Sequence, residues 1–225
     1  MGDVVTIKAF GSSYRIVNPG PGRVGSKLAA GEPYERRLLV DCYQLGLVGT
    51  AFDVGAHIGN HALYFAAVCG LAVHAWEPHA ESREQLETNL SLNAGLRVTV
   101  HDWAAGARRT RGRFTSGMWI EFDPQRDGAC LTIDRGHVQV RRIDDEVDVA
   151  DLAVMKIDVE GMEADVIAGA LGHIDRSRPV IYSETHTAES HDAVARFLEP
   201  LGYRMTRAIH MGSTMERWQH PKGPR

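Results

Sequence analysis

The sequence predicts an α/β protein with a Rossmann-like, doubly wound and mostly parallel sheet of seven strands. From Thr50 onward, short apolar runs alternate with amphipathic stretches of helical spacing, which is the pattern of parallel strands covered by helices. Five of the apolar runs end in an acidic residue. Ligands of open α/β sheets bind beyond the carboxyl ends of the strands, so these acids are expected at a functional edge.

The segment before Thr50 is expected to stand outside the main sheet. "VVTIKAFGSSYRIV" alternates apolar and polar residues on either side of Gly-Ser-Ser, which predicts a β-hairpin. "PGPGRVG" predicts a loop, and "YERRLLVDCYQLGL" has the apolar spacing of a helix. Residues 1–46 are therefore assigned to an N-terminal hairpin and a lead-in helix.

The strands and helices of the sheet follow in alternation. The predicted strands are TAFDVG, LAVHAWE, RVTVHDW, LAVMKIDVE, RPVIYSETH, YRMTRA and TMERWQ. The predicted helices are HALYFAAVCG, AESREQLETNLSLNAG, GMEADVIAGAL and HDAVARFLEPLG. The last two strands are expected to close the sheet as a pair. Right-handed crossovers would bring the carboxyl ends of the parallel strands to one edge.

Residues 104–142 interrupt this alternation. They contain the short β-like runs "RRTRGRF", "GMWIEFD" and "HVQVRR", which predict a β flap between the third and fourth strands. The chain shows no internal repeat, and 225 residues suit a single domain over residues 1–225.

Composition limits the classes of binding partner that the chain is expected to have. The formal charge of −4 gives no sign of a strongly electrostatic partner, so nucleic acid is not expected. The three cysteines, Cys42, Cys69 and Cys130, match no disulfide or zinc pattern, which favours a reducing compartment. No apolar run is long enough to span a bilayer. The sequence thus predicts a cytoplasmic protein without a membrane partner, and it leaves a homodimer open.

The stretch "FDVGAHIGNH" resembles a nucleotide-binding loop. Gly55 and Gly59 flank His57, directly after Asp53 and before Asn60. A dinucleotide fingerprint would have a glycine at position 57 to approach a pyrophosphate. The loop therefore suits a ligand that has a nucleoside and no phosphate.

Two acids further along supply the rest of a nucleoside site. Glu77 ends the second strand, 22 residues beyond the first glycine of the loop, where a carboxylate can accept both ribose hydroxyl protons. Pro78 offers apolar surface beside it. Asp102 ends the third strand beside Trp103 and is expected at the adenine amino group. Glycine loop, ribose acid and adenine acid together describe S-adenosylmethionine.

At this point the sequence resembles the FkbM-family methyltransferases, which are class I S-adenosylmethionine-dependent enzymes. The resemblance rests on "FDVGAHIGNHALYFA", "VHAWEPHAESREQLETNLSLN", "VHDWAAG", "RIDDE" and, most specifically, "VMKIDVEGMEADVIAGAL". It implies methyl transfer to a hydroxyl group, often on a sugar or natural-product scaffold. The family usually has Asn where this chain has His57 and Asp102. The family's lead-in helix also implies that Glu35 approaches the cofactor amine, unless it is a plain exposed acid.

The set of residues expected at the cofactor follows. Asp53 is expected to orient the loop and meet the methionine part, although a loop cap is the alternative; for Asp102 the alternative is a solvated acid. His57 and His61 are four residues apart, and polar roles are favoured over a metal pair. The expected cofactor-binding residues are Glu35, Asp53, Gly55, His57, Gly59, Asn60, Glu77, Pro78, Asp102, Trp103 and Asp158.

Catalysis is expected at the ends of the fourth and fifth strands. His186 is a candidate general base, because its ordinary pKa lies close to operating pH, and Asp158 and Glu184 accompany it. Asp158 would orient the acceptor hydroxyl, whereas Glu160 is read equally well as a helix cap, and Lys156 would pair with these acids or reach the substrate. A divalent metal on Asp158, Glu184 and His186 is a minority alternative; no metal is expected.

The sequence thus favours an O-methyltransferase acting on a small-molecule hydroxyl acceptor. N-directed or RNA-directed methylation and a non-catalytic cofactor-binding module stay as alternatives. A basic cluster beside the flap, which would recognise an acidic substrate or form a solvated loop, consists of Arg108, Arg109, Arg111 and Arg113.

Overall fold

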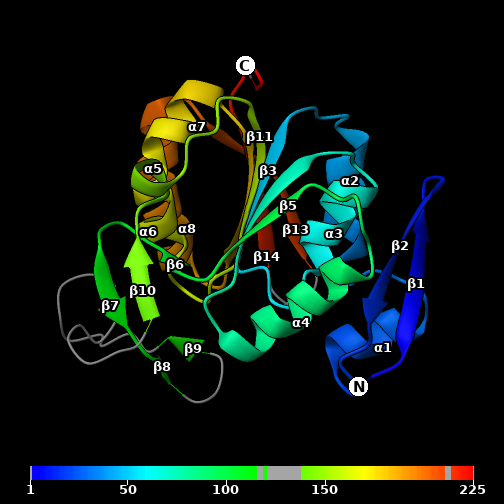
Figure 1. Ribbon diagram of the computed structural model, residues 1–225. Helices are drawn as coiled ribbons and strands as arrows, with labels where there is room; N and C mark the ends of the chain where they lie inside the picture. Colours follow the sequence, from blue (N-terminus) through cyan, green and yellow to red (C-terminus); the bar gives the residue numbers. More distant parts are fainter. Residues whose placement is uncertain (1, 116–118, 121–137, 211–213, 225) are drawn as a thin grey trace.

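A computed structural model of the chain has a central sheet between two layers of helices (Figure 1). The structure describes residues 2–115, 119–120, 138–210 and 214–224. No helix in these ranges has the length and apolar character needed to cross a bilayer.

The central sheet has seven strands in the order β13-β14-β12-β11-β3-β4-β5. Five neighbouring strands run parallel, and the last two strands of the chain are antiparallel at one side. The predicted fold class and the closing pair are therefore confirmed. The strands are β3 (Thr50–Val54), β4 (Ala72–Trp76), β5 (Val98–His101), β11 (Leu152–Ile157), β12 (Val180–Thr185), β13 (Arg204–His210) and β14 (Thr214–Gln219).

Alternation along the strands divides the core between the two faces. Ala51 and Val154 pack with α2, α3 and the N-terminal hairpin, whereas Phe52 and Met155 pack with α5 to α8. These layers lie on opposite sides of the sheet in Figure 1. The helices are α2 (Arg36–Gln44), α3 (Asn60–Ala67), α4 (Ala80–Ser91), α5 (Ile143–Glu146), α6 (Glu163–Gly169), α7 (Leu171–Ser177) and α8 (Ala188–Leu198).

The N-terminal segment folds as predicted except at its loop. The hairpin pairs β1 (Val4–Ala9) with β2 (Ser12–Val17). The loop predicted for "PGPGRVG" is wrong at its end, because helix α1 begins at Arg23 and runs to Ala29. A Cβ on Gly25 would lie 1.7 Å from the carbonyl oxygen of Gly20. Close packing of this glycine outweighs its low helix propensity.

The predicted helix "GMEADVIAGAL" is divided in the structure. Helix α6 ends at Gly169, and a separate helix α7 begins at Leu171. A Cβ on Gly169 would lie 2.1 Å from the carbonyl oxygen of Gly106. The glycine lets the start of the flap approach the helix, and sequence periodicity carries no sign of that contact.

The flap is β-structured where it is described. Strands β6 (Ala104–Ala105), β7 (Thr110–Gly112) and β10 (Val138–Arg141) form one small sheet, and β8 (Phe114–Thr115) pairs with β9 (Trp119–Ile120). The rest of the predicted flap, with Cys130, lies outside the described residues.

Candidate active site

A cavity of about 570 Å³ opens at the carboxyl edge of the sheet, and ligand sites commonly have this size. Loops after β3, β4, β11 and β12 line it together with the flap and the N-terminal segment. Eight residues expected at the site from the sequence lie on its wall: Glu35, Gly55, His57, Glu77, Pro78, Asp158, Glu184 and His186.

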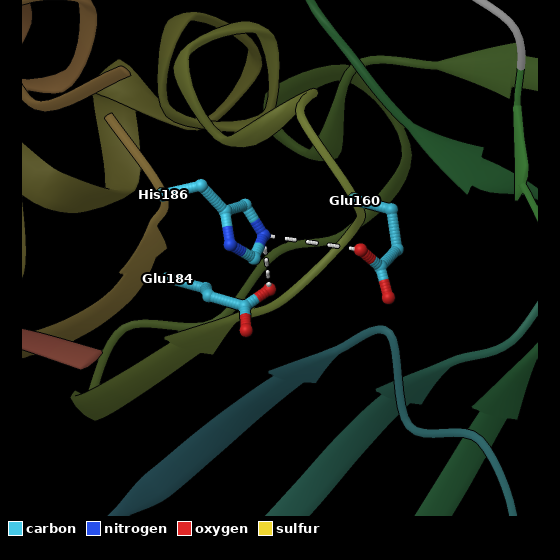
Figure 2. A group of neighbouring side chains, drawn as sticks. All are labelled: Glu160, Glu184 and His186. Carbon is cyan, nitrogen blue, oxygen red and sulfur yellow. Dashed lines mark ion pairs between the residues drawn. The ribbon is translucent and has the colours of Figure 1, made fainter. Parts of the chain in front are cut away.

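One corner of the cavity gathers Glu160, Glu184 and His186 (Figure 2). The Nε2 atom of His186 lies 3.2 Å from Oε2 of Glu184 and 3.9 Å from Oε2 of Glu160. Asp158 lies on the wall of the same cavity. We call Asp158, Glu160, Glu184 and His186 the acidic corner. It exists because β11 and β12 are parallel neighbours whose ends meet.

Glu160 does not cap a helix. Its backbone is left-handed, with φ of +57°, and its carboxylate points toward His186 (Figure 2). The amides of Val159 and Gly161 instead donate to Oε1 of Glu163, at 3.2 and 3.0 Å. The helix-cap interpretation of Glu160 is therefore wrong: α6 begins at Glu163 without a side-chain cap, and the Glu163 carboxylate holds the loop that precedes the helix. Burial and the charge of Asp158 raise the pKa of Glu160.

A buried lysine connects the glycine loop with two acids of the site. The ammonium of Lys156, 1% exposed, lies 3.5 Å from Asp53 and 3.4 Å from Asp158, and it donates to the carbonyl of Gly55 at 2.9 Å. Burial opposes its charge, yet the charges of Asp158 and Asp53 raise the pKa of Lys156. Burial likewise opposes ionisation of Asp158, but Lys156 and the hydrogen bond with Glu184 keep the pKa of Asp158 below its ordinary value.

Asp53 does not lie on the cavity wall. Its side chain is fully buried, pairs with Lys156, and accepts no hydrogen bond from the described residues. The two residues are register partners in β3 and β11. Asp53 therefore supports the loop through Lys156, and its expected contact with the methionine part of the cofactor stays a prediction.

The loop after β3 contains three left-handed residues, Gly55, His57 and Gly59. Gly55 has φ of +84°, and a Cβ there would lie 1.9 Å from the carbonyl oxygen of Asp158. His57 has φ of +50°, a region where Asn, Asp and His are the residues best tolerated after glycine. Histidine in place of the family's usual Asn thus keeps the same backbone. Burial lowers the pKa of His57, and the charge of Lys156 adds to the effect.

Glu77 is oriented by the loop that it faces. Its two carboxylate oxygens accept the backbone N–H groups of His57 at 2.7 Å and His79 at 2.9 Å. Burial raises the pKa of Glu77 although these two bonds oppose the shift. The side chain is thereby fixed on the cavity wall, where the sequence places the ribose acid.

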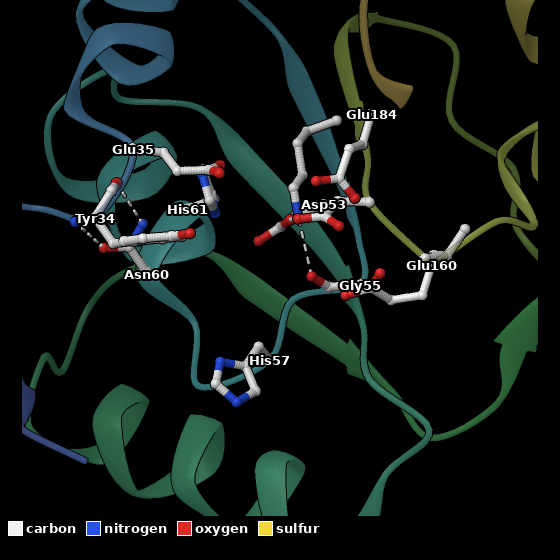
Figure 3. Close-up of polar contacts among 12 residues, drawn as sticks. Tyr34, Glu35, Asp53, Gly55, His57, Asn60, His61, Glu160 and Glu184 are labelled. Atoms are coloured by element: carbon white, nitrogen blue, oxygen red, sulfur yellow. Dashed lines mark hydrogen bonds and ion pairs between the residues drawn. The ribbon is translucent and has the colours of Figure 1, made fainter. Parts of the chain in front are cut away.

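Glu35 is a buried acid of the site. Its left-handed backbone, with φ of +56°, precedes α2, and its Oε2 lies 3.1 Å from Nε2 of His61. Figure 3 shows the two side chains next to each other. The alternative of an exposed helix acid is therefore wrong. No sequence pattern predicts the contact between Glu35 and His61, which lies in the first turn of α3.

Two residues of the loop serve packing. The amide of Asn60 accepts from the N–H of Tyr34 and donates to its carbonyl, both at 3.0 Å (Figure 3). Gly59 lies against Leu86, whose Cδ1 would be 2.5 Å from a Cβ. Neither residue lies on the cavity wall. Gly59 and Asn60 therefore support the loop, and their expected contacts with the cofactor stay a prediction.

The residues expected at the adenine lie off the cavity wall, and their contacts with the cofactor stay a prediction. Asp102 is exposed and Trp103 packs against Trp76, with ring centroids 5.7 Å apart, and neither Asp102 nor Trp103 lies on the wall. Phe114 of the flap lines the cavity instead and packs edge-on against His79. Sequence reasoning missed these residues because the position of the flap depends on long-range packing. The other lining residues that it did not assign are Arg23, Val24, Tyr34, Val54, Ser82, Ala104, Ala105, Val159 and Met162.

The chain matches one protein-family model. The methyltransferase FkbM domain matches residues 53–205, which include β3 through the start of β13. No curated protein matches the sequence.

Solved structures share the fold. A methyltransferase FkbM from Methylobacillus flagellatus is 21% identical, with a TM-score of 0.55, over 75% of this chain and 43% of that chain. This chain thus spans less than half of that protein's length. An S-adenosylmethionine-dependent O-methyltransferase from Thermotoga maritima is 13% identical, with a TM-score of 0.52, over 97% of this chain and 77% of that chain. The Streptococcus mutans protein SMU.1697c, in complex with S-adenosylhomocysteine, is 11% identical, with a TM-score of 0.52, over 81% of this chain and 96% of that chain.

Proposed function

We propose that this chain, which belongs to the methyltransferase FkbM domain family, methylates a hydroxyl group of a small molecule, such as a sugar or a natural-product scaffold. It is an S-adenosylmethionine-dependent methyltransferase; the hydroxyl acceptor is the proposed part. The observation that carries the proposal is the acidic corner, which lines the same cavity as Glu77 and the glycine loop.

The residues of the cavity fit the cofactor. Glu77 presents a fixed carboxylate to a ribose, and Pro78, Val159 and Met162 give apolar surface for a purine. Glu35 lines the same cavity while its Oε2 atom pairs with His61, and we propose that its carboxylate meets the amino group of the cofactor. When bound, S-adenosylmethionine supplies an electrophilic methyl group.

The acidic corner suits a hydroxyl acceptor. Asp158 and Glu184 offer carboxylate oxygens to which a hydroxyl can donate, and His186 lies beside them. A held hydroxyl attacks more readily because orientation removes entropy from the barrier, and a nearby group must take its proton. Asp158 and His186 are therefore proposed to act on the acceptor and not on the cofactor.

The charge of the cavity disfavours RNA as the acceptor. Among the described lining residues, the side chains of Glu35, Glu77, Asp158, Glu160 and Glu184 are acidic, and Arg23 is the one arginine or lysine. A nucleic-acid groove needs cations against phosphates. This balance supports a neutral or cationic small molecule.

Two variants test the proposal. His186→Ala and Asp158→Ala are expected to lose methyl transfer to hydroxyl acceptors while they bind S-adenosylhomocysteine with unchanged affinity. Calorimetry gives the affinity, and release of S-adenosylhomocysteine during turnover gives the rate. Loss of cofactor binding in both variants would remove the acceptor role of these residues, and a wild-type chain that methylates only amines or RNA would overturn the proposal.

A further inference from the structure

We infer that Glu160, Glu184 and His186 form a binding site for a divalent metal ion that holds the acceptor hydroxyl. The inference rests on the proposed function and deepens it, because it assigns His186 as a metal ligand in place of a general base. It also replaces Asp158, which the sequence suggests as a ligand, with Glu160.

The ligand atoms are already gathered. One ligand atom from each of the three residues lies within 4.8 Å of the other two, and Figure 2 shows all three side chains turned toward one another. Adjacent ligands of an octahedral ion with bonds near 2.1 Å are about 3 Å apart. The 3.2 Å between His186 and Glu184 matches this spacing. The 3.9 Å to Glu160 needs a movement of about 1 Å, and the Glu160 side chain is partly exposed.

Glu160 has no structural partner that explains its position. A left-handed backbone is unfavourable for glutamate, and the Glu160 side chain does not cap α6. Among the described residues, the one ion pair of its carboxylate is the distant His186. A costly backbone thus presents a carboxylate to the corner, which points to a ligand there.

The buried ammonium group next to the acidic corner already has partners. The ammonium of Lys156 is engaged by Asp53, Asp158 and the Gly55 carbonyl. The carboxylates of Glu160 and Glu184 both lie beside the Nε2 atom of His186. A bound cation would neutralise both carboxylates.

The ligand set indicates which ion fits. Two carboxylate oxygens and one imidazole leave about three octahedral positions for water or substrate, a pattern that suits Mg²⁺ or Mn²⁺ better than structural zinc. An acceptor with two adjacent oxygens, such as a vicinal diol, would fill two of these positions.

The ion would also supply the proton chemistry. A metal lowers the pKa of a bound hydroxyl, so the hydroxyl proton leaves to water without a protein base. The oxygen electron pair then forms the bond to the methyl carbon, and the pair of the broken carbon–sulfur bond stays on sulfur. Charge and atoms balance with S-adenosylhomocysteine as the second product.

Binding of Mn²⁺ alone tests the site without turnover. The wild-type chain is expected to bind one Mn²⁺, with imidazole nitrogen coupling in pulsed electron paramagnetic resonance. Glu160→Gln and His186→Asn should each weaken binding at least about tenfold, and His186→Asn should remove the nitrogen coupling. Glu189→Gln removes a nearby exposed acid and should bind Mn²⁺ as the wild type does. Binding that is absent, or equal in all four proteins, would overturn the inference.

Metal removal separates the inference from the proposed function. After dialysis against a chelator, the chain should still bind S-adenosylhomocysteine, lose transfer to a diol acceptor, and regain it with Mg²⁺ or Mn²⁺. Full transfer by the metal-free enzyme, together with its loss in His186→Ala, would restore His186 as the base and leave O-methylation intact. Absence of any O-methylated product with or without metal would instead overturn the proposed function.

Discussion

Lys156→Met should lower the free energy of unfolding by about 3–5 kcal/mol, the usual cost of removing one partner of a buried ion pair. The Lys156 side chain is 1% exposed and that of Asp53 is fully buried, so methionine keeps the volume but leaves the Asp53 carboxylate without its cation. The same change removes the bond to the Gly55 carbonyl and the partner of Asp158, so cofactor affinity should fall as well.

Urea unfolding with linear extrapolation measures the loss. Lys27→Met is the matched control, because Lys27 pairs with Glu32 at 3.7 Å but is 59% exposed, and such pairs contribute less than about 1 kcal/mol. In the double variant Asp53→Asn/Lys156→Met the loss should be smaller than the sum of the two single losses. A Lys156→Met loss no larger than that of Lys27→Met would refute the buried-pair reasoning.

Other predictions concern the loop, the ribose acid and the core. Gly55→Ala should cost about 2–4 kcal/mol of stability, because the residue has a left-handed φ and its Cβ would lie 1.9 Å from a backbone oxygen. Gly70 is also left-handed but has open space around its Cβ position, so Gly70→Ala should cost only about 1 kcal/mol. Equal losses of the two variants in urea unfolding would contradict the role of the backbone contact. Glu77→Ala should weaken S-adenosylhomocysteine binding about tenfold to hundredfold in calorimetry, as expected for a charged hydrogen bond, whereas exposed Glu84→Ala should not. Burial lowers the pKa of His101 to about 4, below its ordinary value, so the unfolded chain binds the proton first as pH falls. Stability should therefore drop between about pH 6.5 and 4, and His101→Phe should flatten this profile; an unchanged profile would exclude His101 as its source.

The sheet was predictable because its signals are local. Each parallel strand is a short apolar run, and the residue at its end is read directly from the sequence. Glu77 was placed correctly by its distance from the glycine loop, and the acids after β11 and β12 followed from the geometry of parallel neighbours.

The rest of the site depends on contacts that no local pattern encodes. The flap brings Phe114 to the cavity where Asp102 and Trp103 were expected, and the packing of Trp103 against Trp76 decides that difference. Asn60 is engaged by the backbone of Tyr34, 26 residues earlier.

The sequence also does not show which of two neighbouring acids has a structural role. Glu160 and Glu163 both stand near the start of α6, and either could have capped it. In the structure the Glu163 carboxylate accepts the N–H groups of Val159 and Gly161 in the preceding loop, whereas the left-handed Glu160 lies on the cavity wall. That difference separates a structural acid from a proposed metal ligand.

The central proposal is methyl transfer to oxygen. The most direct measurement supplies S-adenosylmethionine with a ¹³C-labelled methyl group, together with hydroxylated small molecules, amine analogues and RNA, and locates the label in the products by nuclear magnetic resonance. The proposal predicts the label on a hydroxyl oxygen of a small molecule, with loss of the signal in Asp158→Ala. A label found only on nitrogen or in RNA would contradict it.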